Sequence, residues 1–154
     1  MVNLPYISVL DIISLLVISL LVGAEICLTF FINPVILKLD KASLSKFGQL
    51  LTSRLATPFP IWNVLVLLFL VTEAFIRWGT DAFPLVTIAC ILWIAAAIFT
   101  LIFMLPLNTK LARQTEDMSK DEVVTVFTYW ANRHLPRLCM LLTALVFYMV
   151  ALYI

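Results

Sequence analysis

Charged residues are scarce in this chain of 154 residues, at 12% of the total, against roughly 25% in an ordinary soluble domain. The formal net charge is only +1, which excludes the strongly basic surface that binds nucleic acid through its phosphates. Hydrophobic residues make up 64%, and a soluble fold of this length could not bury so much apolar surface. We therefore expect an integral membrane protein with a single domain over residues 1–154.

Glycine, histidine and cysteine are also rare, and their scarcity excludes several kinds of site. The three glycines, Gly23, Gly48 and Gly79, form no phosphate-binding loop and no G-x-S-x-G nucleophile motif. The single histidine and the three dispersed cysteines give no C-x-x-C, H-x-x-x-H or Glu-x-x-His pair. The sequence therefore predicts no metal site and no cofactor.

Long apolar runs, by contrast, are abundant. Crossing ~30 Å of hydrocarbon takes about 20 residues of helix, and four runs reach or approach that length. Each run must be helical because the bilayer offers no water to satisfy backbone polar groups. The predicted fold is all-α, an integral membrane bundle of four transmembrane helices. The predicted spans are residues 7–37, 60–78, 83–107 and 136–154.

The basic residues are distributed unevenly around these spans. Only Arg77, at the end of the second span, lies on the side of the short connection to the third span. The other nine lie on the side of the two long connections, eight within them and Arg137 at the start of the fourth span: Lys38, Lys41, Lys46, Arg54, Lys110, Arg113, Lys120, Arg133 and Arg137. Because Lys and Arg accumulate on the cytoplasmic side, we expect both long connections in the cytoplasm and both termini outside. A plasma (inner) membrane location fits this pattern.

The first long connection is more than a linker. Leu44, Phe47, Leu51 and Leu55 recur every three or four residues among polar side chains. That spacing predicts an amphipathic helix, of the kind that lies on the inner membrane interface.

The second long connection also contains a predicted amphipathic helix. Ser119 and Glu122 form the S-x-x-E capping box that starts a helix. One face of this helix carries Val123, Phe127, Trp130 and His134. Pro136 stands between it and the fourth span, where a proline either kinks the helix or opens the span at its first turn.

Polar residues follow one face of the first span. At 100° per residue, five side chains fall within about 100° of arc: Asp11, Ser14, Glu25, Thr29 and Asn33. Glu25 is the most telling, because a carboxylate near mid-bilayer is costly and should face the bundle. It is either a proton acceptor or cavity wall, or a protonated, hydrogen-bonded structural residue.

Two further groups of polar residues lie near the ends of the spans. Glu73 and Arg77 have the i, i+4 spacing of a helix ion pair. His134 shares a helix face with Trp130 and Arg137. A histidine in such surroundings could act as a general base near neutral pH, or these residues could form the aromatic and basic belt common at membrane interfaces.

Three segments, in this order, resemble the anthrone-oxygenase-like family of small four-span membrane proteins. The first is Gly-Ala-Glu at 23–25 followed by Phe-Phe-Ile-Asn-Pro-Val-Ile-Leu at 30–37. The second, residues 105–111, is similar to that family's P-x-N-x-x-L motif after the third span. The third, residues 130–137, is similar to its W-x-x-x-H-x-x-R motif before the fourth span.

The resemblance implies cofactor-independent oxidation of an anthrone to an anthraquinone. A flat phenolic substrate would stack near Trp130, and His134 would remove a proton. Asn108, Arg137 and Asn33 would stabilise the resulting oxyanion. These residues are expected at one depth, with Glu25 about 12 Å deeper by helix rise, relaying a proton or lining the pocket.

A non-enzymatic protein remains the alternative: one that binds lipid or a small molecule, acts as a scaffold, or moves a proton or solute. An enzyme needs His134, Asn108 and Arg137 around one enclosed pocket, whereas a proton path would connect Asp11, Glu25 and Asn33 through the bundle. The expected partners are the lipid bilayer and a small hydrophobic molecule. A homo-oligomer is compatible with the small residues at 95–97.

Overall fold

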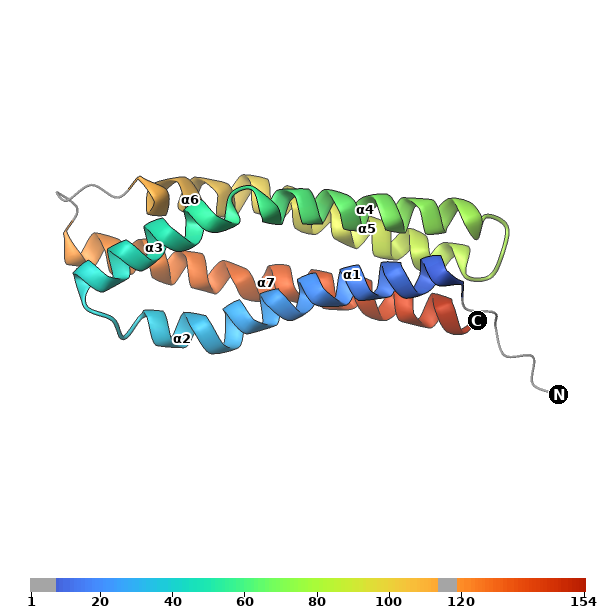
Figure 1. The fold of residues 1–154 in the computed structure, drawn as a ribbon, viewed down its shortest axis with the longest axis horizontal. Helices are drawn as coiled ribbons and strands as arrows, with labels where there is room; N and C mark the ends of the chain where they lie inside the picture. Colours follow the sequence, from blue (N-terminus) through green and yellow to red (C-terminus); the bar gives the residue numbers. More distant parts are fainter. Residues whose placement is uncertain (1–7, 114–118) are drawn as a thin grey trace.

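Four long helical rods lie side by side in the computed structural model, which describes residues 8–113 and 119–154 (Figure 1). Residue 7, where the first span is predicted to begin, lies outside the described residues. In the described part, four helical stretches are long and apolar enough to cross a membrane. They cover Val9–Ile36, Lys41–Ile76, Phe83–Ala112 and Asp121–Tyr153. The predicted all-helical four-span fold is confirmed.

The rods are built from nine helical elements in the described residues. Two of these, η1 and η2, are short π-helical segments inside longer rods. In chain order the elements are α1 Val9–Ile26, η1 Cys27–Ile32, α2 Asn33–Ile36, α3 Lys41–Leu55, α4 Pro58–Ile76, α5 Phe83–Phe99, η2 Thr100–Met104, α6 Leu105–Ala112 and α7 Lys120–Tyr153.

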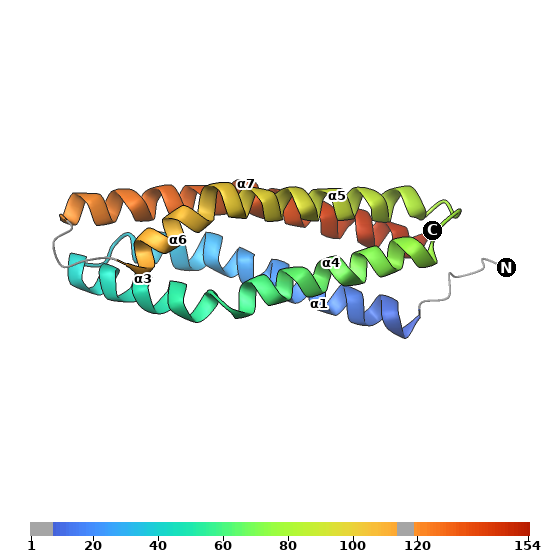
Figure 2. The ribbon, with the colours of Figure 1, turned by 90° about the horizontal axis from the view of Figure 1, so that it is seen from above.

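The packing forms a closed square of antiparallel neighbours. α1 contacts α4 and α7, and α5 contacts α4 and α7, an order that both views show (Figures 1 and 2). The start of α1, the α4–α5 turn and the end of α7 lie together, and we call this the terminal end. The opposite end, which carries α2, α3, α6 and the start of α7, we call the basic end.

Each π-helical segment precedes a proline. Pro34 follows η1 and Pro106 follows η2, each within the first two positions of the next helix. Proline has no N–H, so it cannot bond to the carbonyl four residues earlier. A wider π turn is one way for a helix to continue past that gap, and such turns are frequent at functional sites. The two rods are alike in this respect.

The face of α3 that was expected on the membrane interface is instead covered by protein. Leu44 is fully buried in an apolar cluster with Met104, Leu111 and Phe127. α3 contacts α6 and α7, whose own apolar faces accept it. The predicted amphipathic helix is present, and its apolar face packs against protein because a matching protein surface lies next to it.

The second connecting helix is not separate from the fourth span. Ser119 and Glu122 make the predicted capping box, but α7 then runs without interruption through Pro136 to Tyr153. The predicted apolar face is buried, with Val123, Phe127 and Trp130 each no more than 3% exposed. This continuity decides where His134 lies.

Candidate active site

Three charged or ionisable side chains meet in the bundle interior. Glu25 on α1 is fully buried, and His134 and Arg137 on α7 are 3% and 5% exposed. Arg137 Nη1 donates to Glu25 Oε1 at 2.5 Å, and His134 Nδ1 lies 3.2 Å from Glu25 Oε2. Each carboxylate oxygen thus has one partner, as a buried charge requires.

Glu25 and His134 lie at the same height, so the prediction that Glu25 is about 12 Å deeper is wrong. At ~1.5 Å per residue, Glu25 is about 24 Å along α1 from Val9, and His134 is about 28 Å along α7 from Tyr153. Because α7 continues through Pro136, His134 is well inside the bundle and not at its boundary. Glu25 is therefore a direct partner of the histidine.

The carboxylate also determines which ring nitrogen of His134 is free. An ionised carboxylate only accepts hydrogen bonds, so Nδ1 must carry the hydrogen that Glu25 receives. In the neutral ring this leaves Nε2 unprotonated, with its lone pair available. His134 Nε2 is buried and has no hydrogen-bond partner within the described residues. In histidines that act as general bases, a carboxylate commonly binds one ring nitrogen and leaves the other free to accept a proton, as Glu25 does here with Nδ1 and Nε2 of His134.

Trp130 and Asn108 form the adjoining wall. The rings of Trp130 and His134 meet edge to face, with centroids 4.2 Å apart. Trp130 Nε1 donates to Asn108 Oδ1 at 2.7 Å, which links α7 to α6. Because the amide oxygen of Asn108 is occupied, its NH₂ group is the part left to donate to a ligand.

Asn33 is the one predicted site residue that the structure does not bring to this place. Asn33 is 6% exposed, and neither atom of its amide has a partner in the described residues. It lies eight residues beyond Glu25, about 12 Å further toward the basic end by helix rise. Since His134 is level with Glu25 and not with Asn33, the oxyanion role expected for Asn33 has no support in the geometry.

A cavity of about 470 Å³ opens beside the Glu25–His134–Arg137 group, within the usual size range of small-molecule sites. Asn108 and Trp130 also line it, so five of the six predicted site residues share its wall. The rest of the lining comes mainly from η1, α3, α4, α5, η2 and α6. Among the large apolar side chains of the lining, Leu101 and Val64 are the most exposed, at 62% and 57%.

Three further polar residues of the lining were not predicted from the sequence. Asn63 on α4, Thr52 on α3 and Thr100 in η2 all line the cavity. Asn63 could have been suspected as an amide within an apolar span. Threonines are common in membrane helices, and no sequence signal distinguishes Thr100 from Thr87 or Thr143.

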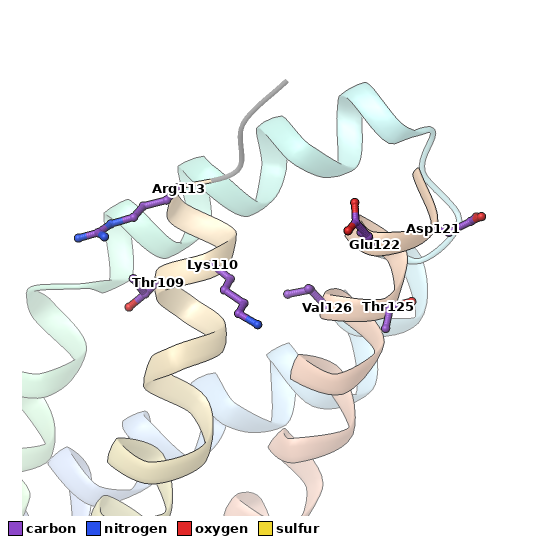
Figure 3. A pocket seen from close by; sticks show the side chains of 7 residues that line it. All are labelled: Thr109, Lys110, Arg113, Asp121, Glu122, Thr125 and Val126. Atoms are coloured by element: carbon purple, nitrogen blue, oxygen red, sulfur yellow. The ribbon is translucent and has the colours of Figure 1, made fainter. Parts of the chain in front are cut away.

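A second hollow lies between α6 and α7 at the basic end (Figure 3). Its charged side chains are exposed and carry both signs, which is typical of a solvated surface. The residues lining it are Thr109, Lys110, Arg113, Asp121, Glu122, Thr125 and Val126.

The terminal end contains a separate buried ionic cluster. The expected Arg77–Glu73 pair is confirmed at 3.3 Å, and Arg77 also bonds to Asp11 at 2.5 Å. Ser14 Oγ donates to the second oxygen of Glu73 at 3.3 Å. Asp11 and Ser14 are thus anchored to α4 and not to Glu25.

Comparison with known proteins identifies the family. The anthrone oxygenase family model matches residues 49–147, nearly two thirds of the chain. The matched part contains Asn108, Trp130, His134 and Arg137, whereas Glu25 lies before it. Neither the curated proteins nor the solved structures contain a match to the chain. On the extent of the family match, the chain belongs to the anthrone oxygenase family.

Proposed function

We propose that this protein is a membrane-embedded, cofactor-independent oxygenase that converts an anthrone-like phenol to the corresponding quinone. The observation that carries the proposal is the free Nε2 of His134. Glu25 orients this histidine, which lines a cavity that also has exposed apolar side chains in its wall. The family match supports the same reaction class.

The mouth of the cavity supports access from the bilayer. We place this mouth at Val64, Leu101 and Leu105, which line the cavity and are 57%, 62% and 49% exposed. They belong to rods with the length and hydropathy of membrane spans, so an apolar tricyclic molecule would reach the cavity without leaving the lipid phase. Inside, it would meet the Trp130 ring and then the polar wall.

The reaction begins with proton transfer from the substrate methylene carbon to His134 Nε2. The electron pair left behind delocalises onto the carbonyl oxygen, where the NH₂ group of Asn108 stabilises the developing charge. Glu25 stabilises the imidazolium through Nδ1, and Arg137 keeps Glu25 ionised and in place.

Dioxygen is the oxidant, and the atoms balance. The carbanion reduces O₂ to form a carbon–oxygen bond, and His134 returns its proton to give the hydroperoxide. Removal of the second C–H proton by His134 then breaks the O–O bond and forms the ketone. The expelled hydroxide takes that proton and leaves as water. One anthrone and one O₂ thus give one quinone and one water.

The non-enzymatic alternative of a proton path finds less support. The buried side chains of α1 between Ser14 and Glu25, and those of α7 between Arg137 and Tyr148, are apolar. On α1 they are Ile18, Leu21 and Val22, and on α7 Leu138, Leu141 and Ala144. In the described part of the chain, these layers of α1 and α7 offer no hydrogen-bonding side chain that would link the two ends.

The test is turnover of an added anthrone by the purified protein in lipid nanodiscs, followed by O₂ uptake and quinone absorbance. Replacing His134 by Ala should lower the rate above background at least about 100-fold, the usual contribution of a general base. Leu135→Ala is the matched control, because Leu135 is the next residue and is 50% exposed. Binding of the anthrone without O₂ uptake by the native protein would support the non-enzymatic alternative instead.

We also propose that the basic end faces the cytoplasm of a plasma membrane. This places the Glu25–His134–Arg137 group in the cytoplasmic half of the bilayer.

A further inference from the structure

The hydroxyl groups of the cavity wall have already used their hydrogen atoms. Thr100 Oγ1 donates to the carbonyl of Ala96 at 2.8 Å, and Thr52 Oγ1 donates to the carbonyl of Gly48 at 2.7 Å. The other hydroxyls of the lining, those of Ser53 and Thr109, donate to Leu50 and Leu105 in the same way.

A hydroxyl has one hydrogen to donate and two lone pairs to accept with. Once the hydrogen is bonded to the preceding helical turn, only acceptor capacity remains. Thr52 is 8% exposed and Thr100 is half-buried, so both lie away from bulk solvent. The hydroxyl groups of Thr52 and Thr100, which line the same cavity as the Glu25–His134–Arg137 group, therefore offer hydrogen-bond acceptors.

We propose that Thr52 and Thr100 determine specificity by accepting hydrogen bonds from phenolic hydroxyl groups of the ligand. Hydroxyl groups that only accept favour a ligand that donates, and they offer no hydrogen bond to a carbonyl or ether oxygen. This inference rests on the proposed function, since it concerns the same cavity. It concerns recognition, however, and does not depend on the chemical step.

A matched control exists on the same rod as Thr100. Thr87 Oγ1 donates to the carbonyl of Phe83 at 2.8 Å, the same local bond, but Thr87 does not line the cavity. Threonine-to-valine substitution is nearly isosteric and removes the hydroxyl. Any effect of losing the local helix bond alone will therefore appear equally in Thr87→Val.

The experiment measures equilibrium binding of two probes that cannot undergo the reaction, xanthone and 3-hydroxyxanthone, to the full chain in nanodiscs. Both are flat tricyclic ketones without an oxidisable methylene carbon, and only the second donates a hydrogen bond. The native protein should prefer 3-hydroxyxanthone. Thr100→Val or Thr52→Val should lower its affinity for that probe about 3- to 10-fold, the worth of one hydrogen bond. Affinity for xanthone should stay within twofold.

Equal affinity of the native protein for the two probes would overturn the inference, as would a Thr87→Val effect as large as that of Thr100→Val. If either Thr52→Val or Thr100→Val fails to fold, the inference is still tested by the other variant and by the preference of the native protein between the two probes. Unaltered turnover in His134→Ala would refute the proposed function without touching this result. Normal turnover without any preference between the probes would refute only the specificity proposal.

Discussion

Glu25 depends on its two partners for a stable place in the bundle. Glu25→Gln removes the charge that compensates Arg137, which is 5% exposed, and a buried pair broken on one side typically costs 3–5 kcal/mol. We therefore expect the unfolding midpoint of Glu25→Gln, measured by intrinsic fluorescence in detergent, to fall clearly, with turnover falling too. Asp81→Asn, an exposed acid in the turn between α4 and α5, should leave both unchanged.

A double variant separates charge balance from catalysis. Glu25→Leu combined with Arg137→Met removes both charges, so it should recover most of the lost stability without recovering turnover. If the double variant is no more stable than Glu25→Gln, the unpaired charge of Arg137 is not what destabilises Glu25→Gln.

At the residue scale, sequence patterns predicted which side chains face inward but not which of them meet. The polar stripe placed Glu25 toward the bundle interior, and the shared face placed His134 with Trp130 and Arg137. The contact between Glu25 and His134 depends on α7 continuing through Pro136. A proline at that position is compatible with either a kinked helix or a new one, so the sequence left the height of His134 open.

At the scale of elements, α3 stabilises the basic end through packing within the protein. Leu44 is fully buried, whereas Leu50 on the same helix is 56% exposed. Leu44→Ala should therefore cost about 2–5 kcal/mol in unfolding free energy, and Leu50→Ala should cost far less. Denaturation in mixed micelles would measure both, and similar small losses would indicate that the apolar face of α3 rests on lipid after all.

The period of Leu44, Phe47 and Leu51 predicted the apolar face of α3 correctly, but it could not predict what covers that face. Lipid and protein are equally apolar partners for such a face. The choice depends on where α6 and the first turns of α7 lie, which is a matter of tertiary arrangement. The same holds for the cavity, because its walls come from all four rods and the sequence does not say how the rods are arranged.

At the scale of the whole molecule, the two ends of the bundle differ in free positive charge. Arg77 at the terminal end is bonded to Asp11 and Glu73, and Arg137 is bonded to Glu25 inside the bundle. The remaining Lys and Arg residues all belong to the connections and helices of the basic end. The buried ion pairs therefore leave the excess of Lys and Arg at the basic end unchanged. Because Lys and Arg accumulate on the cytoplasmic side, we expect the basic end to face the cytoplasm.

Labelling with a membrane-impermeant maleimide in intact cells tests this orientation. Cysteine in place of Thr80, which is exposed at the terminal end, should react from outside. Cysteine in place of Ala42, which is exposed at the start of α3, should react only after the cells are opened. The native chain is the control, because its exposed thiols, Cys27 and Cys139, lie in membrane-spanning rods. The reverse pattern, or labelling of both positions from outside, would contradict the orientation. In that case the cavity would lie in the outer half of the bilayer, and its substrate would come from the outer leaflet.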